Sequence, residues 1–133
     1  MKVFVYWNLH KNLWSVKALE GNNRGRVIAR LPYVYLTNVT QKVSEKGRQR
    51  VIKTKQKNVH AGIVGNFDQK CIVLLTENKK EKLICLLDLV QITYNPYLYE
   101  KFVLKEDTNK SWNSAKSVCM FPDRTVYLSE IHY

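Results

Sequence analysis

Short runs with a period of two, bounded by turn-forming residues, recur along the chain and constrain its fold more than any other sequence feature. Residues 2–7 are a clear case, because Val3, Val5 and Trp7 would all point to one face of an extended chain. This period is typical of a β-strand. Together with denser apolar runs, it predicts strands at residues 2–7, 13–19, 26–31, 33–39, 59–64, 71–76, 83–93, 115–120 and 126–131. Run 83–93 could instead contain a short buried helix.

Turns rich in Gly, Asn and Pro separate these runs, notably at residues 20–25, 77–81 and 122–124. These residue types tolerate or impose the backbone conformations that reverse a chain. Many short strands joined by such turns indicate a mostly antiparallel sheet.

One stretch departs from the β pattern. Ser44 can cap a helix over residues 45–57, because its hydroxyl can accept a first-turn amide hydrogen, and Glu45 suits the positive end of that helix. Lys46, Arg50, Lys53 and Lys57 would then share one helix face. A strand remains an alternative, because cations in this stretch also recur with a period of two. We therefore expect one α+β domain over residues 1–133, a curved, mostly antiparallel β-sheet with one basic helix.

Size and composition fit a folded protein. The chain has 133 residues, enough for one self-sufficient core, and 45% of them are hydrophobic. The chain contains neither an apolar run long enough to span a membrane nor the pattern of a signal peptide. Its three scattered cysteines suit reduced thiols better than a disulfide framework. We expect a cytoplasmic protein without membrane contact.

The net charge of +11 is concentrated in one part of the chain. Between Arg24 and His60 there are ten Lys or Arg residues and a single acid, Glu45. From Ala61 to Tyr133 the count is nine basic against nine acidic residues. Concentrated positive charge repels itself in the folded state. The sequence therefore indicates a polyanionic partner that neutralises this segment.

The basic segment supplies the first group of candidate site residues. Arg48 and Arg50 could bind phosphate oxygens through two hydrogen bonds each, and lysines could add point charges. The candidates for phosphate or nucleic-acid binding are Arg26, Lys46, Arg48, Arg50, Lys53, Lys55, Lys57 and His60. The alternative is a solvated helix face that only aids solubility.

A second group comes from the aromatic-rich stretch 94–102, which holds four aromatics in nine residues. Aromatic rings beside a basic surface can stack on exposed bases. The candidates for base stacking or ligand contact are Tyr94, Asn95, Tyr97 and Phe102. The alternative is that these rings only anchor a loop on the core. Trp7, Trp14 and Trp112 are interpreted as structural.

Enzymatic chemistry has little support in the sequence. The chain shows no P-loop, no nucleophile elbow and no G-x-G-x-x-G motif, and its Cys and His residues lack the spacing of zinc ligands. We therefore expect no catalytic residue, metal or cofactor. A metal-independent ribonuclease using His60 remains an alternative, because RNA supplies its own 2′-hydroxyl nucleophile.

Several blocks of the chain resemble an uncharacterised family of small accessory proteins of tailed bacteriophages. The most specific blocks are Asn-Val-His-Ala at residues 58–61 and Tyr-Asn-Pro at residues 94–96, and the likeness spans about residues 3 to 128. Further blocks are Arg26-Val-Ile, residues 43–51 and Phe102. The resemblance implies expression in the cytoplasm of an infected bacterium, as an accessory factor acting on host systems or on phage nucleic acid.

These observations lead to one principal hypothesis. It is a phage accessory binding protein that engages a phosphate-bearing partner, RNA or DNA, through its basic face. One alternative is a counter-defence protein that sequesters a small nucleotide signal or an acidic host protein. Another is the metal-independent ribonuclease.

Overall fold

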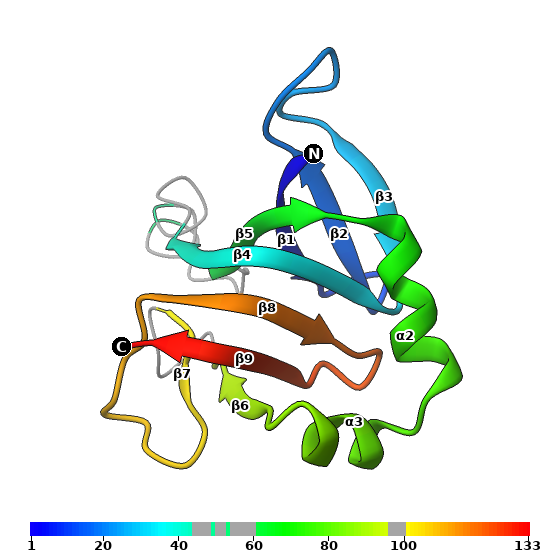
Figure 1. Ribbon diagram of the computed structural model, residues 1–133. Helices are drawn as coiled ribbons and strands as arrows, with labels where there is room; N and C mark the ends of the chain where they lie inside the picture. The colour runs from blue at the N-terminus through cyan, green and yellow to red at the C-terminus, as the bar shows by residue number, and fades with distance from the viewer. Residues whose placement is uncertain (44–48, 50–52, 54–60, 96–100) are drawn as a thin grey trace.

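The computed structural model describes residues 1–43, 49, 53, 61–95 and 101–133. In this part of the chain, nine strands form one sheet with the order β3-β2-β1-β5-β4-β8-β9-β6-β7 (Figure 1). The strands are β1 (Lys2–Asn8), β2 (Leu13–Ala18), β3 (Val27–Leu31), β4 (Val34–Val43), β5 (Ala61–Phe67), β6 (Val90–Thr93), β7 (Val103–Leu104), β8 (Ser114–Met120) and β9 (Val126–His132). Every pairing between neighbouring strands is antiparallel.

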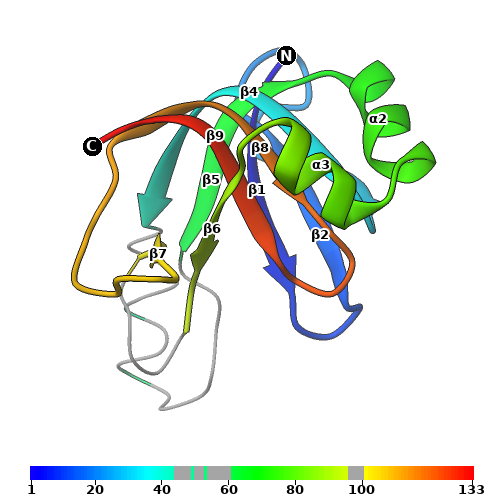
Figure 2. The same cartoon turned by 60° about the horizontal axis from the view of Figure 1, so that its bottom comes forward.

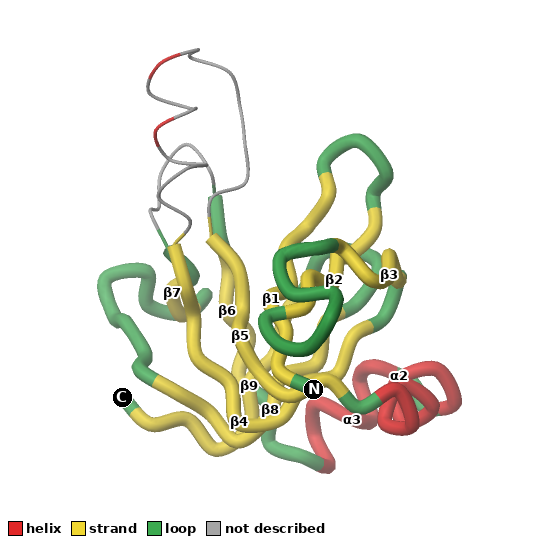
Figure 3. The backbone as a smooth tube through the Cα atoms, turned by 90° about the horizontal axis from the view of Figure 1, so that it is seen from above, coloured by secondary structure: helices red, strands yellow, loops and turns green. Residues whose placement is uncertain are grey.

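The sheet is curved, and its two ends face each other across a concave side (Figure 3). Two short helices, α2 (Ile72–Glu77) and α3 (Lys80–Leu86), lie on the outer side in the described part of the chain (Figure 2). This arrangement confirms the prediction of an α+β fold built on a curved antiparallel sheet.

The main core fills the concave side. In β1 the side chains of Val3, Val5 and Trp7 are buried, as the period of two predicts. Alternate residues of the central strands join them. The fully buried large side chains of this core are those of Trp14, Leu36, Ile63, Ile92, Met120 and Leu128. Burial of this apolar surface is the main source of the fold's stability.

The β1–β2 hairpin brings two tryptophans together at one end of the sheet. The side chain of Asn8 accepts hydrogen bonds from the backbone N–H groups of His10 and Lys11, and Asn12 adopts a left-handed conformation. The register of this hairpin pairs Trp7 with Trp14. Both strands and the turn between them were predicted from the sequence.

The prediction of a strand at residues 71–76 is wrong. After β5, a 3₁₀ turn at Gln69–Cys71 leads directly into α2. Asp68 starts this turn, because its side chain accepts a hydrogen bond from the backbone N–H of Lys70 at 3.0 Å. A short apolar run fits a strand and a buried helix equally well, so periodicity could not separate them.

The prediction of one long strand at residues 83–93 is correct only at its end. Its first part belongs to α3, and β6 begins at Val90. The helix ends because Asp88 adopts a left-handed conformation with φ of 50°. The backbone N–H of Leu89 then bonds back to the carbonyl of Ile84 at 3.0 Å, which is the Schellman pattern of helix termination.

Strand boundaries also differ from the predictions in β4 and β5, and one strand was missed. β4 continues to Val43, beyond its predicted end at Val39. β5 continues through Gly65 to Phe67, where the sequence indicated a link. The short edge strand β7 was not predicted. The predicted basic helix lies mostly outside the described residues. Gln49 and Lys53, the two described residues within it, are helical and exposed.

A second apolar cluster joins the two helices to the outer face of the sheet. Leu75 of α2 and Leu83 of α3 pack here against side chains from β8 and β9. Cys119 belongs to this cluster, and its burial raises the pKa of the thiol to about 12. Cys119 lies between Val118 and Met120, whose side chains point to the concave core. Successive side chains of β8 therefore point to opposite faces of the sheet and belong to different clusters.

Lys80 of α3 ties this outer layer to the turn between β8 and β9. Its ammonium lies 2.6 Å from Asp123 Oδ2, and it sits 5.3 Å from the ring centre of Phe121 and 5.4 Å from that of Tyr127. Partial burial raises the pKa of Asp123. Hydrogen bonds from Lys80 and Thr125 lower this pKa by more, so that its value is about 2. The carboxylate of Asp123 is therefore ionised and already engaged.

Gly62 in β5 should not tolerate a side chain. A Cβ atom there would lie 2.5 Å from the carbonyl oxygen of Val5 and 2.6 Å from the ring of Phe4. We expect Gly62→Ala to lower the free energy of unfolding by about 1–3 kcal/mol in urea denaturation, because the backbone of β1 must move. The control is Gly21→Asn, at an open position with φ of 77° that Asn tolerates, and it should change the same quantity by less than about 1 kcal/mol. Equal effects of the two substitutions would contradict this packing.

The Lys80–Asp123 pair predicts a pH dependence of stability. Because the folded-state pKa of Asp123 lies below its ordinary value of 3.8, its carboxylate stabilises the fold fully above that pH, and the contribution is lost as the pH falls toward 2. Asp123 is 55% exposed, so we expect Asp123→Asn to cost at most about 1 kcal/mol at neutral pH. The difference from the wild type should shrink between about pH 4 and 2. A difference that stays constant over this range would show that the charge contributes nothing.

Candidate functional site

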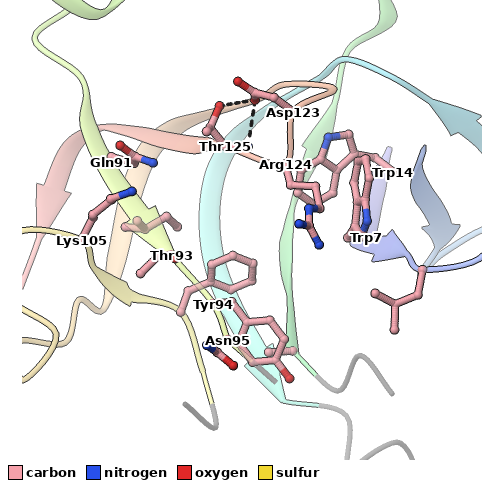
Figure 4. A pocket seen from close by; sticks show the side chains of 14 residues that line it. Trp7, Trp14, Gln91, Thr93, Tyr94, Asn95, Lys105, Asp123, Arg124 and Thr125 are labelled. Carbon is pink, nitrogen blue, oxygen red and sulfur yellow. Dashed lines mark hydrogen bonds between the residues drawn. The ribbon is translucent and has the colours of Figure 1, made fainter. Parts of the chain in front are cut away.

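A pocket of about 480 Å³ opens on the concave side of the sheet, between the β1–β2 hairpin and β6 (Figure 4). The hairpin contributes Trp7, Leu9 and Trp14, and residues 91–95 form the opposite wall. The turn between β8 and β9 contributes residues 123–125. Its volume is in the range of small-molecule sites. Ala61, Phe102 and Lys105 complete the lining, so segments distant in sequence build one concave site.

The hairpin wall is aromatic and held in place. The rings of Trp7 and Trp14 meet edge to face, with centroids 4.9 Å apart and an interplanar angle of 76°. The indole N–H of Trp14 donates a hydrogen bond to the carbonyl of Phe121 at 2.8 Å. The indole nitrogen of Trp7 is buried and has no hydrogen-bond partner among the described residues. Within the part of the chain that the structure describes, the indole N–H of Trp14 is therefore hydrogen-bonded, whereas that of Trp7 is not.

The opposite wall carries a second pair of rings. Tyr94 and Phe102 lie 5.3 Å apart at 36°, and both line the pocket together with Asn95. Tyr94 is half-buried, whereas Phe102 is only 6% exposed and belongs to the core cluster. Phe102 therefore supports the ring of Tyr94 and leaves little surface of its own for a ligand.

Two exposed cations, Lys105 and Arg124, also line the pocket. Arg124 sits in the β8–β9 turn with φ of 71°, and its backbone N–H bonds to the carbonyl of Phe121 at 3.0 Å. Its side chain extends from this turn into the pocket, on the side of the two tryptophans (Figure 4). Asp123 brings a negative charge, but that charge is paired with Lys80. The pocket therefore has a surplus of positive charge.

The structure brings part of the sequence-predicted site to this pocket. Tyr94, Asn95 and Phe102 line it, and so does Ala61, which follows the basic segment directly in the chain. Lys53 is exposed and helical, but it is not among the lining residues. Lys46, Arg48, Arg50, Lys55, Lys57, His60 and Tyr97 lie outside the described residues.

Arg26 is exposed in the connection between β2 and β3 and does not line the pocket. Its backbone is engaged locally, because its N–H bonds to the carbonyl of Asn23 at 2.9 Å. The structure therefore separates Arg26 from the aromatic candidates.

Sequence reasoning missed several lining residues. Trp7 and Trp14 are buried, which confirms their structural interpretation, but they also form a wall of the pocket. The hairpin register offered a signal for them, because residues paired across a hairpin point to the same face. Lys105 and Arg124 gave no such signal, since only the curvature of the sheet brings them to the hairpin. The other missed lining residues with polar side chains are Gln91, Thr93, Asp123 and Thr125.

The described part of the chain offers neither a cluster of metal ligands nor a membrane-spanning helix. No group of three or more His, Cys, Asp or Glu side chains is arranged to hold a metal ion in this part of the chain. Within the same ranges, no helix has the length and apolar character needed to cross a membrane.

Comparison with known proteins places the chain among phage proteins. A family model described as Mycobacterium phage L5 gene 82 protein matches residues 1–128. The Gene 82 protein of Mycobacterium phage L5 is 41% identical over 111 residues, which cover 77% of each chain. No solved structure matches the chain. The resemblance to a phage family is confirmed, and the chain belongs to the Mycobacterium phage L5 gene 82 protein family.

Proposed function

We propose that this phage protein binds a phosphate-bearing partner, a single-stranded nucleic acid, and that its pocket receives one unpaired nucleotide. One observation carries the proposal. Tyr94 and Asn95 of the aromatic-rich stretch line the same pocket as two exposed cations, Lys105 and Arg124. Aromatic rings and positive charge thus meet in one site, where a base and its phosphate would also lie together.

The shape of the pocket supports a single unpaired base. Its volume of about 480 Å³ suits one nucleotide, and it is walled by rings on two sides. Stacking on aromatic rings is the usual way in which proteins hold bases of a single strand. A base inside a duplex would have to leave its helical stack to enter such a pocket. The proposal therefore favours single strands over duplexes.

The charge of the pocket supports a phosphate beside the base. Lys105 and Arg124 are exposed and neither forms an ion pair with another described residue, while the carboxylate of Asp123 is paired with Lys80. Arg can grip phosphate oxygens through its guanidinium, and Lys can approach them as a point charge. The sequence holds further cations in the segment 44–57, which precedes Ala61 in the chain.

A free nucleotide shares the same chemistry as a nucleotide within a strand. It would use the rings and the two cations of the pocket, but it would not need the additional cations of the segment 44–57. The dependence of affinity on oligonucleotide length distinguishes a polynucleotide ligand from a free nucleotide. Affinity that rises with oligonucleotide length indicates a polynucleotide, and affinity that is the same for a mononucleotide and a long strand indicates a small ligand.

The salt dependence of binding tests this proposal. We expect a labelled single-stranded oligonucleotide to bind with an affinity that falls on a log–log plot by about 0.7 for each phosphate contact. Lys105→Gln and Arg124→Gln should each weaken binding and reduce that slope by about 0.7, because each removes one contact. Fluorescence anisotropy over a range of salt concentrations measures both quantities.

Lys79→Gln is the matched control. Lys79 is exposed and lies at the start of α3 on the outer side of the sheet, so its loss should leave affinity and slope close to those of the wild type. Unchanged slopes in both pocket variants, or tighter binding of duplex than of single strand, would contradict the proposal.

A further inference from the structure

The three tryptophans of the chain are all buried, but only the indole N–H of Trp14 donates a hydrogen bond within the described residues. Trp14 is 2% exposed and donates to the carbonyl of Phe121. Trp7 and Trp112 are 9% and 3% exposed, and neither indole nitrogen has a hydrogen-bond partner among the described residues. A buried donor without an acceptor is uncommon and destabilising, so each such donor calls for an explanation.

Only Trp7 combines an unpaired donor with a place in the aromatic pocket. Its side chain lines the pocket near the side chain of Arg124 (Figure 4), and its indole nitrogen is buried. Trp112 lies instead in a separate hollow with Gln41, Ser111 and Tyr133. The unpaired donor of Trp7 is thus placed where a bound molecule could supply the missing acceptor.

We propose that the indole N–H of Trp7 is the specificity-determining donor of the pocket and bonds to an acceptor on the edge of a bound nucleobase. The assignment of the ligand as a nucleobase rests on the proposed function. Base carbonyl oxygens and unprotonated ring nitrogens are such acceptors. A ring of similar shape without an acceptor would leave the donor unpaired and would bind more weakly.

The surroundings of Trp7 explain why the acceptor must come from outside. Edge-to-face packing against Trp14 fixes the indole ring, so it cannot turn to find another partner. Leu9 and Ala61, which also line the pocket, offer only apolar side chains. The indole nitrogen has almost no exposed surface, so a ligand reaches it only when a neighbouring side chain moves.

Arg124 is suited to that movement. It is exposed, it belongs to a turn, and it extends into the pocket on the side of Trp7 (Figure 4). Displacement of this side chain by an entering base would give the ligand room beside the indole ring of Trp7.

Nuclear magnetic resonance of the indole N–H groups tests the proposal directly. The three signals can be assigned from the variants Trp7→Phe, Trp14→Phe and Trp112→Phe. We expect saturating natural nucleosides, which carry no phosphate, to shift the Trp7 indole proton downfield and to leave those of Trp14 and Trp112 unchanged. A phenyl C-nucleoside, which has no acceptor on its ring, should produce no such downfield shift.

Affinity measurements complete the test. Trp7→Phe keeps an aromatic wall but removes the donor, and we expect it to weaken binding of a single-stranded oligonucleotide by about tenfold. Trp112→Phe, the matched control, should leave that affinity unchanged. If Trp7→Phe prevents folding, the nucleoside titration of the wild-type protein still decides the question.

The possible results separate this inference from the proposed function. Oligonucleotide binding without a shift of the Trp7 proton would overturn the role of Trp7 and leave the proposed function intact. A nucleoside-induced shift without oligonucleotide binding would support the donor and overturn the nucleic-acid partner. Absence of both effects would overturn both proposals.

Discussion

The hydrogen bond from the Trp14 indole to the carbonyl of Phe121 joins two parts of the chain that are 107 residues apart. It attaches the β1–β2 hairpin to the turn between β8 and β9, although β5 and β4 separate β1 from β8 within the sheet. The bond is buried, and the indole N–H of Trp14 would lose its acceptor if the hairpin moved away, whereas the carbonyl of Phe121 would keep its hydrogen bond from the backbone N–H of Arg124. The concave pocket exists because this attachment brings Trp7 and Trp14 opposite β6 and beside Arg124.

The two faces of the sheet have different roles. On the outer face, α2 and α3 cover a small apolar cluster, and Lys80 fixes the β8–β9 turn through Asp123. On the inner face, the same turn presents Arg124 to the pocket. The ion pair on one side therefore positions a cation on the other, and it neutralises a carboxylate that would otherwise repel an anionic ligand.

Local patterns predicted much of the fold, while contacts between distant segments did not follow from them. The period of two in β1 and the turn chemistry around Asn8 and Asn12 were sufficient for the first hairpin. The short apolar run that forms α2 was taken for a strand, because its length suits either structure. Within the site, Tyr94 and Asn95 were predicted from aromatic clustering. Lys105 and Arg124 could not be, because their place at the pocket depends on the curvature of the whole sheet.

A nucleotide held in the concave pocket should react with the side chains around it when a bound oligonucleotide containing 4-thiouridine is crosslinked by ultraviolet light. Mass spectrometry of the digested complex then locates the attached residue. We expect adducts on pocket residues, foremost on Trp7 and Tyr94. Adducts confined to α2 and α3 on the outer face, with none on the pocket residues, would contradict this placement of the nucleotide.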